Sequence, residues 1–551
     1  MLIIGAKATH DAGVACIEDG SLRFSIELEK LGNGRRYSTL PDLTAALDIL
    51  ELEGIAPSDV DQLVIDGWHA GDARNLGEPV TLNLLAGGRS AVIPVGPYHE
   101  GRGSTADLRY EFQGLPLGLS GRSEGRYSSY AHVAGHIYSA YCTSPMAGRG
   151  HAAAVLVWDG AMFPRLYGVD PNTREIESLG PLFPVSGGTF GRFASNLPPF
   201  TDMKQNGDVL GVAGKAMAYA GLGSARPDLL QLLRETIANM NPFKVEADAL
   251  LARRMTDSTD GSASYADLIA TMQEYLGAEL VSSLGERYRR DPRLRKYPCI
   301  CLAGGCALNI KWNSRLRSCD LFDEVWIPPF PNDSGSAIGM ACAEMVHRTG
   351  VYALDWDVFR GPKLVDSAAP QGWKRNACSP TELGELLYRS GDPVVVLTGR
   401  AELGPRALGH RSILAAAVKP EMKDLLNAIK GREEYRPVAP ICLEDKAVEV
   451  FSPGSPDRFM LFDHGFRGDW QRRIPAVAHV DGTARLQTVS RESDLVLWTI
   501  LESYERASGL PVLCNTSGNL RGCGFFPSAT AAMDWGQVDR VWTEGSLYEK
   551  C

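Results

Sequence analysis

Two strand–turn–strand units in the first third of the chain constrain its fold more than any other feature. The first begins with the apolar run at Leu2 and turns at Asp19-Gly20, and the second begins at Ala152 and reaches Asp159-Gly160. An acid followed by glycine between two apolar runs is a strong hairpin signal. Because the same unit occurs twice, the sequence predicts a duplicated α/β fold with a cleft between its halves.

Helical patterns separate these units from a third apolar strand, which begins at Tyr297 and runs into a Gly-Gly pair. We expect helices over residues 42–53 and 265–288, and an irregular linker over 355–380 that mixes Gly, Pro, Asp and Lys. A new strand begins at Pro393, before a segment rich in arginine. The sequence therefore predicts two α/β domains, residues 1–365 and residues 380–551.

Composition excludes several classes of protein. Asp and Glu total 66 against 56 Lys and Arg, which gives a net charge of −10 and no general attraction for nucleic acids or anionic membranes. No apolar window approaches the roughly 18–20 residues needed to span a bilayer, and charged residues follow the first strand too early for a signal peptide. The 12 cysteines lack the spacing of a disulfide scaffold or a CxxC zinc pair. We expect a soluble, cytoplasmic protein that binds neither nucleic acid nor membrane.

Two histidines and two aspartates form a candidate metal site. His132 and His136 are four residues apart, a spacing that places both imidazoles on one face of a helix. Asp159 ends a buried strand, and Asp333 lies in a polar turn before an apolar helix, where a helix N-cap is the alternative role. A mixed nitrogen and oxygen set of this kind suits Fe(II), Mn(II) or Zn(II) rather than Ca(II).

The glycine pair after the third strand is typical of a turn that binds a phosphate or a nucleoside. Gly304 and Gly305 let backbone N–H groups approach an anion, and Asn309 follows at the start of the next helix. Lys215 is a second candidate phosphate contact, although an exposed lysine at a helix start explains it equally well.

The C-terminal segment gathers arginines among glycines and prolines in three clusters. Guanidinium groups bind phosphate or carboxylate through paired hydrogen bonds. Surface salt bridging is the alternative for any single arginine, but arginines in turns beside glycine have little helical role. The sequence predicts an anion pocket built from Arg406, Arg411, Lys430, Arg432, Arg436, Arg485, Thr516 and Ser517.

Taken in order, these motifs resemble the O-carbamoyltransferase family, which includes the nodulation-factor enzyme and the antibiotic-tailoring enzymes for cephamycin and tobramycin. The resemblance covers essentially the whole chain, and Lys7-Ala-Thr-His-Asp and Ile65-Asp66-Gly67-Trp68 are most similar to the nodulation branch. The motifs that carry it are Thr9-His10-Asp11, His132-x-x-x-His136, Trp158-Asp159-Gly160, Gly304-Gly305-x-x-x-Asn309, Asn332-Asp333-Ser-Gly, Gly-Pro-Arg406, Lys430-x-Arg432, His479-Val-Asp481 and Asn515-Thr-Ser517.

The resemblance implies a fold and a reaction. The N-terminal domain would resemble actin, Hsp70 and sugar kinases, and the C-terminal domain would be YrdC-like. In the C-terminal domain, carbamoyl phosphate and ATP, bound with Mg(II), would form carbamoyl-adenylate. The carbamoyl group would then pass to an acceptor hydroxyl in the N-terminal domain.

The resemblance also assigns roles to residues. His10, beside Asp11, would be the general base, because the pKa of an imidazole lies near working pH. Lys430 and Arg436 would act in adenylate formation, and the other residues of the predicted anion pocket would bind phosphates with Lys215 and the Gly304-Gly305 turn. The metal, with Fe(II) as first choice and Mn(II) or Zn(II) as alternatives, would be held by His132, His136, Asp159 and Asp333.

The expected acceptor is a hydroxyl group of a sugar-containing natural product, in a step of antibiotic tailoring. A nodulation-type lipo-oligosaccharide and threonylcarbamoyl transfer to tRNA are the alternatives, and the acidic composition argues against the tRNA substrate. The sequence is also compatible with a homodimer of this chain. The family usually has Asn-Thr-Ser-Phe-Asn followed by Gly-Glu-Pro, whereas this chain has Gly518 and Gly522-Cys523-Gly524.

Overall fold

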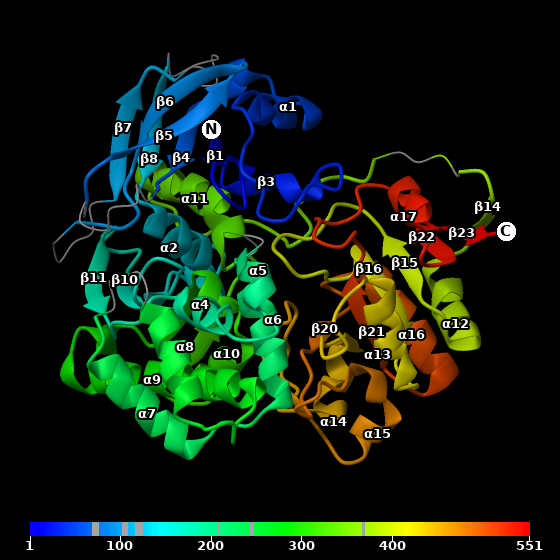
Figure 1. Cartoon of the computed structure of the whole chain (residues 1–551). Helices are drawn as coiled ribbons and strands as arrows, with labels where there is room; N and C mark the ends of the chain where they lie inside the picture. The colour runs from blue at the N-terminus through cyan, green and yellow to red at the C-terminus, as the bar shows by residue number, and fades with distance from the viewer. Residues whose placement is uncertain are drawn as a thin grey trace.

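Two sheets in the N-terminal part of the chain repeat one topology (Figure 1). Their strand orders are β3-β2-β1-β4-β8-β7 and β11-β10-β9-β12-β13. In each sheet the first two pairings are antiparallel and the next two are parallel. The topology confirms the predicted duplication. The computed structural model describes residues 1–68, 77–101, 108–115, 125–205, 209–241, 247–365, 368 and 370–551.

The central strands of both sheets are runs of apolar residues that are buried along their length, as expected of strands covered on both faces. The first sheet contains β1 (Leu2–Lys7), β2 (Gly13–Glu18), β3 (Ser21–Glu27), β4 (Gln62–Asp66), β7 (Arg109–Gln113) and β8 (Arg126–Tyr130). The second contains β9 (Ala153–Val157), β10 (Arg165–Val169), β11 (Ile176–Pro181), β12 (Cys299–Ala303) and β13 (Glu324–Trp326). A separate pair joins β5 (Val80–Ala86) to β6 (Arg89–Val95).

The two predicted hairpins differ in their turns. Asp19 and Gly20 both have positive φ, at 48° and 87°, as a tight two-residue hairpin requires. The second hairpin is wider, because β9 ends at Val157 and β10 begins only at Arg165. Asp159 and Gly160 lie in the long loop between these strands and do not form a tight two-residue turn.

Two helices fill the space between the sheets and cross at a pair of glycines. Helix α11 (Ser336–Thr349) packs against β1, β2 and β4, and helix α2 (His132–Cys142) packs against β9 and β12. A Cβ atom at Gly339 would lie 1.9 Å from the carbonyl oxygen of Gly135. Only glycine therefore permits this crossing, which brings the N-terminal end of α2 close to the turn that precedes α11.

Most of the other N-terminal helices cover the outer faces of the two sheets, whereas Met146 and Ala147 of the short helix Pro145–Arg149 join the core between the sheets. The predicted helix at 265–288 is α9, which begins with a capping box between Ser264 and Asp267, and the predicted helix at 42–53 is α1. The bounds are α1 (Thr44–Leu52), α3 (Pro145–Arg149), α4 (Thr189–Ala194), α5 (Thr201–Gln205), α6 (Val212–Tyr219), α7 (Pro227–Ala238), α8 (Ala247–Asp257), α9 (Tyr265–Arg290) and α10 (Ile310–Arg317).

A third sheet, of order β14-β23-β22-β15-β16-β21-β17-β20, has its own hydrophobic core in the C-terminal part of the chain, drawn in yellow to red in Figure 1. Its strands are β14 (Trp373–Ala377), β15 (Val394–Leu397), β16 (Arg411–Ala416), β17 (Ala439–Leu443), β20 (Gln487–Val489), β21 (Val512–Ser517), β22 (Arg540–Thr543) and β23 (Ser546–Lys550). The remaining elements are α12 (Pro380–Ser390), α13 (Glu421–Ile429), α14 (Ala447–Val450), β18 (Phe451–Ser452), β19 (Gly465–Phe466), α15 (Trp470–Arg473), α16 (Leu495–Ser508) and α17 (Ala529–Trp535).

The stretch expected to be an irregular linker, residues 355–380, is irregular only in its first part among the described residues, because strand β14 (Trp373–Ala377) lies within it and pairs with β23 (Ser546–Lys550) of the third sheet. Part of it nevertheless runs along the edge of the first sheet, because Leu22 and Ser25 donate backbone hydrogen bonds to the carbonyls of Asp355 and Arg360. The beginning of this stretch, residues 355–360, is therefore held against the first sheet. Within the described ranges, no helix combines the length and apolar character needed to cross a membrane.

Replacing Gly339 with alanine should disrupt the helix crossing. We expect the Gly339→Ala variant to unfold about 1–3 kcal/mol more easily, because the added methyl group forces two helix backbones apart. Gly214→Ala is the matched control, since a Cβ atom at this helical glycine meets nothing within 4 Å. Urea unfolding of both variants tests the prediction, and equal midpoints for the two would contradict it.

Candidate active site

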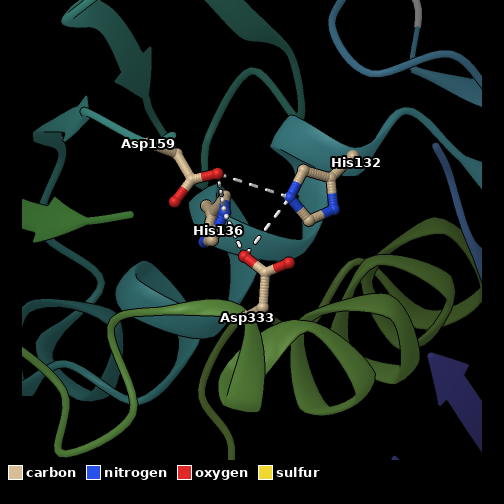
Figure 2. A group of neighbouring side chains, drawn as sticks. All are labelled: His132, His136, Asp159 and Asp333. Carbon is tan, nitrogen blue, oxygen red and sulfur yellow. Dashed lines mark ion pairs between the residues drawn. The ribbon is translucent and has the colours of Figure 1, made fainter. Parts of the chain in front are cut away.

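Four buried side chains converge where the N-terminal end of α2, the loop after β9 and the turn before α11 meet (Figure 2). One ligand atom from each of them lies within 4.8 Å of the ligand atoms of the other three. The Nε2 atoms of both histidines lie 3.5 Å from Oδ1 of Asp333, and 3.8 and 3.9 Å from Oδ2 of Asp159. The four predicted metal ligands, His132, His136, Asp159 and Asp333, are thus brought together by the fold.

The spacing of these atoms fits a metal ion better than a hydrogen-bonded network. Nε2 of His132 and Nε2 of His136 are buried without a hydrogen-bond partner, which would be costly if the site held nothing else. Four ligands about 2.1 Å from a tetrahedral ion lie about 3.4 Å from one another, close to the separations seen here. The donor set therefore fits a transition-metal ion.

A second layer of polar residues orients the four ligands. Nδ1 of His132 donates to Oδ2 of Asp66 at 2.9 Å, and this hydrogen bond leaves Nε2 with its lone pair directed at the cluster. Lys7 bridges Asp66 at 3.1 Å and Asp333 at 2.9 Å from a completely buried position. The Tyr98 hydroxyl donates to Asp159.

The charges of this region are not balanced by protein groups alone. The carboxylates of Asp66, Asp159 and Asp333 face the single ammonium of Lys7. Burial alone would raise the pKa of Asp333, but the charge of Lys7 holds it well below its usual range, so the carboxylate is ionised. A divalent cation would neutralise the two remaining negative charges.

Asp66, Lys7 and Tyr98 were not among the site residues predicted from the sequence. Asp66 ends β4 and precedes Gly67, the same strand–acid–glycine pattern that singled out Asp159. That pattern could have identified it. Nothing local distinguishes Lys7 or Tyr98, whose roles depend on contacts between distant segments.

His10 and Asp11, the predicted general base and its neighbour, lie beside the metal cluster. Nδ1 of His10 donates to Oδ2 of Asp11 at 3.0 Å, and Nε2 lies 3.5 Å from Oδ2 of Asp333. Since a carboxylate can only accept, Nδ1 carries a hydrogen, and Nε2 is the nitrogen that takes a proton when the ring is neutral. Burial lowers the pKa of His10, but the hydrogen bond to Asp11 and the charge of Asp333 raise it above its ordinary value. The side chain is 32% exposed, so a substrate can reach it.

The Gly304-Gly305 turn contributes to the metal cluster itself. The N–H of Gly305 donates to Oδ1 of Asp159 at 2.8 Å. Gly304 has a φ of 88°, and a Cβ atom there would lie 2.4 Å from the carbonyl oxygen of Trp158. Asn309 caps helix α10, since its Oδ1 accepts from the N–H of Lys311 at 3.1 Å. The glycine turn and the Asn309 cap both position this loop. Contact of Gly304, Gly305 and Asn309 with a nucleotide stays a prediction.

Four of the predicted arginines form a second cluster, in the C-terminal part. Burial and the charge of Arg436 lower the pKa of Arg432 to about 9 and that of Arg406 to about 10. Burial and the charges of Arg406 and Arg436 lower the pKa of Arg485. Glu433, the acid that follows Arg432 in the sequence, forms its ion pair with Lys215 at 3.1 Å and not with an arginine of this cluster.

Nothing in the described part of the chain offsets this concentration of positive charge with an ion pair. The Nε atoms of Arg406 and Arg485 are buried and have no hydrogen-bond partner. Guanidinium groups that repel one another and keep unused donors are suited to a ligand with several negative charges. We name the cluster of Arg406, Arg432, Arg436 and Arg485 the basic pocket.

The other predicted pocket residues have different surroundings. Arg432 donates to the hydroxyls of Thr516 at 3.1 Å and Ser517 at 2.9 Å, so both hydroxyls line the basic pocket. Lys430 is buried and donates to the carbonyls of Ser517 and Asn519 and to the Asn519 side chain, which uses all three of its hydrogens. It therefore supports the wall of the pocket in this structure.

Arg411 is not part of this cluster. Its buried guanidinium donates to the carbonyls of Thr398, Gly399, His410 and Pro362. Arg411 therefore holds loops together. The sequence placed it in the predicted anion pocket because glycine and proline lie near it, and such a pattern does not show which groups its guanidinium contacts.

One short turn connects the metal cluster to the basic pocket. The 3₁₀ turn Gly305–Leu308 begins at the N–H that binds Asp159 and ends at the carbonyl of Leu308, to which Arg406 donates at 3.4 Å. The two clusters therefore lie on either side of one turn of backbone, although one is built from residues 132–333 and the other from residues 406–485.

Two family models match this chain, one over each part. A model of the carbamoyltransferase N-terminus matches residues 2–342, and a model of the carbamoyltransferase C-terminus matches residues 386–550. The chain belongs to the carbamoyltransferase family. It is therefore an enzyme that transfers carbamoyl groups, as the sequence motifs predicted.

Relatives of this carbamoyltransferase are found among nodulation and antibiotic proteins. Nodulation protein U of Rhizobium tropici is 46% identical over 100% of this chain and 96% of its own length. The 3'-hydroxymethylcephem-O-carbamoyltransferase of Streptomyces clavuligerus is 33% identical over 95% of this chain and 94% of its own. The greater similarity to Nodulation protein U agrees with the branch predicted from the sequence.

Among solved structures, the activator of the 2-hydroxyisocaproyl-CoA dehydratase from Clostridium difficile with bound ADPNP matches 67% of this chain and 100% of its own at 12% identity. Its TM-score is 0.29, which is too low to support an inference about fold or ligand.

Removing the charge that orients His132 should weaken metal binding. We expect Asp66→Asn to lower metal affinity about 10–100-fold, the usual effect of losing a partner of a metal-bound histidine. Metal content after loading with Fe(II), Mn(II) or Zn(II), measured against a competing chelator, tests this. The exposed Asp59→Asn is the control, and equal affinities in both variants would contradict the assignment.

Replacing one arginine of the basic pocket with a neutral residue should make the protein more stable and its binding of anions weaker. We expect Arg485→Met to raise the thermal unfolding midpoint in phosphate-free buffer, because it removes repulsion among buried charges. The same variant should bind pyrophosphate about 10–100-fold more weakly. Arg389→Met, at the exposed end of α12, is the control for calorimetric titration and melting. An Arg485→Met variant that is less stable and binds normally would contradict the prediction.

Proposed function

We propose that this carbamoyltransferase forms carbamoyl-adenylate from carbamoyl phosphate and ATP in the basic pocket and transfers the carbamoyl group to an acceptor hydroxyl at the metal cluster. The observation that carries the proposal is the pairing of two sites of opposite charge across the Gly305–Leu308 turn. One site attracts phosphates, and the other combines metal ligands with an accessible imidazole. A two-step transfer needs both sites and a short path between them.

The proposal includes the domain assignment made from the sequence. Residues 1–365 would form a domain like actin, Hsp70 and sugar kinases, and the repeated antiparallel and parallel pairing of its two sheets supports this. Residues 380–551 would form a YrdC-like domain, for which the separate core and the basic pocket are the support. A likeness of fold alone would not justify the activity.

The basic pocket is suited to the first step because both substrates carry phosphate groups. Water would release carbamate and inorganic phosphate from carbamoyl phosphate. A carbamate oxygen would then attack the α-phosphorus of ATP, and pyrophosphate would leave with Mg(II). Arg406, Arg432, Arg436 and Arg485 would stabilise the negative charge that develops on the phosphate oxygens, which is the largest contribution in chemistry of this kind.

The metal cluster is suited to the second step. His132, His136, Asp159 and Asp333 would hold the ion, which when bound supplies Lewis-acid polarisation of a carbonyl group. His10 would accept the proton of the acceptor hydroxyl on Nε2, with Asp11 holding the ring through Nδ1. The acceptor oxygen would form a bond to the carbamoyl carbon as the bond from that carbon to the AMP oxygen breaks.

The comparisons favour one acceptor class over the other. The chain is 46% identical to Nodulation protein U of Rhizobium tropici and 33% identical to the cephem carbamoyltransferase of Streptomyces clavuligerus. We therefore propose a nodulation-type lipo-oligosaccharide as the first acceptor to test. The antibiotic acceptor expected from the sequence has no specific support. A hydroxymethyl cephem is the second candidate acceptor, because the relative from Streptomyces clavuligerus carries that name.

Mass spectrometry tests this function directly. The protein is incubated with ATP, Mg(II), carbamoyl phosphate and Fe(II), with a nodulation-type lipo-oligosaccharide or a hydroxymethyl cephem as acceptor. The expected result is release of AMP and an acceptor that gains the mass of one carbamoyl group. Wild-type protein that consumes no ATP in the presence of carbamoyl phosphate would refute the proposal.

Two substitutions should separate the half-reactions. His10→Ala should abolish transfer to the acceptor while carbamoyl phosphate-dependent exchange between ATP and pyrophosphate continues, because only transfer needs the base. Arg436→Ala should stop the exchange, because the first step loses a charge that stabilises it. Labelled pyrophosphate measures the exchange, and mass spectrometry measures the transfer. Transfer that persists in His10→Ala would show that His10 is not the base, and normal exchange in Arg436→Ala would remove Arg436 from the first site.

A further inference from the structure

A segment of the N-terminal part reaches the wall of the basic pocket. After β3 and the short turn Leu28–Lys30, the chain approaches the loop that follows β21. The N–H of Arg36 donates to the carbonyl of Gly522 at 3.0 Å, and the N–H of Gly524 donates to the carbonyl of Gly34 at 2.9 Å. Arg35 and Cys523 form an isolated antiparallel bridge between these hydrogen bonds. The two segments are therefore paired by their backbones.

This pairing gives a physical role to one glycine of the Gly522-Cys523-Gly524 departure. A Cβ atom at Gly524 would lie 1.8 Å from the carbonyl oxygen of Glu29, so any other residue would push the two segments apart. Gly34 is also restricted, because its Cβ atom would lie 2.8 Å from the carbonyl oxygen of Leu28. The loop is built to receive the N-terminal segment at close range.

Arg36 is the cation that this segment brings to the pocket. Its Nε donates a long hydrogen bond of 3.4 Å to the carbonyl of Cys523, which holds the guanidinium at the loop. The charge of Arg36 is among the causes that lower the pKa values of Arg406, Arg432 and Arg436, after burial. It lowers the pKa of Lys430 in the same way. Arg36 therefore belongs to the same electrostatic cluster.

The contacts of Arg36 differ from those of arginines that hold the structure together. Arg411 fills its donors with four backbone carbonyls, and Arg400 forms two hydrogen bonds with the carboxylate of Glu53. In the described ranges, the guanidinium of Arg36 has only its one long hydrogen bond and no ion pair. It is half-buried beside the cations of the basic pocket and the carboxyl of Glu29, with which it forms no ion pair, so its unused donors remain available to an anion.

We propose that Arg36 is a substrate-binding residue of the basic pocket and contacts a phosphate group of carbamoyl phosphate or ATP. The identity of the anion, carbamoyl phosphate or ATP, rests on the proposed function. The existence of an anion site at Arg36 does not. It follows that the pocket is complete only when the Gly34–Arg36 segment is paired with the Gly522–Gly524 loop. The first-step site is then built from both parts of the chain.

The test compares Arg36→Gln with Arg35→Gln in the full-length protein. Arg35 is exposed and pairs with the loop through its backbone, so its substitution controls for effects on the segment. We expect Arg36→Gln to weaken pyrophosphate binding, measured by calorimetric titration, about 10–100-fold, as for the loss of a charged hydrogen bond. Arg36→Lys, which keeps the charge, should recover part of the affinity. The thermal midpoint of Arg36→Gln should be no lower than that of Arg35→Gln, because the substitution removes a charge that repels the pocket arginines.

Kinetics then identifies the phosphate that Arg36 contacts. A KM increase for carbamoyl phosphate alone in Arg36→Gln would place Arg36 at that substrate, and an increase for ATP alone would place it at the triphosphate. Wild-type affinity for pyrophosphate and unchanged KM values in Arg36→Gln would overturn the proposal. A loss of affinity that is equal in Arg36→Lys and comes with a lower melting point would overturn it in favour of a structural role.

The outcomes for the two proposals are distinguishable. If the wild-type protein binds pyrophosphate through Arg36 but consumes no ATP with carbamoyl phosphate, the proposed function fails and the binding residue stands. If the wild-type protein forms carbamoyl-adenylate and Arg36→Gln forms it with unchanged KM values and affinity, only the inference about Arg36 fails.

Discussion

The close crossing of helices α2 and α11 is the contact on which the candidate metal site depends. Gly135 and Gly339 have no side chains to separate the helices, and the histidines of α2 stand on either side of this contact. The first sheet packs on α11 and the second on α2, so the crossing also sets the separation of the two sheets. A wider crossing would move Asp333 away from both imidazoles, because Asp333 begins the turn that leads directly into α11.

Two concentrations of unbalanced charge are the second organising feature. Carboxylates exceed cations at the metal cluster, whereas guanidinium groups lack acidic partners in the basic pocket. Each arrangement costs stability in the absence of a ligand, which is typical of sites that bind ions of the opposite sign. The turn between Gly305 and Leu308 holds the two together, so one piece of backbone positions a ligand for a metal and a donor for an anion.

Much of the metal site could be predicted from the sequence because its signals are local. Histidines four residues apart share a helix face, and acids at strand ends share one edge of a sheet. Asp66 was missed, although it ends a strand and precedes a glycine in the same local pattern that identified Asp159. Arg411 was grouped with the other arginines because Gly and Pro surround it, and no sequence pattern shows that four carbonyls already occupy its guanidinium.

By itself, the sequence determined the duplicated α/β architecture, which follows from hydrophobic periodicity, and the family, which follows from the resemblance of its motifs. Spacing within single helices and turns predicted most of the candidate metal ligands. Tertiary structure alone decided which cations share a pocket and which tie loops together. It also joined Arg36 to arginines more than 350 residues further along the chain. The physical reason is that charge interactions depend on distance and burial, and neither is defined until separate segments pack against each other.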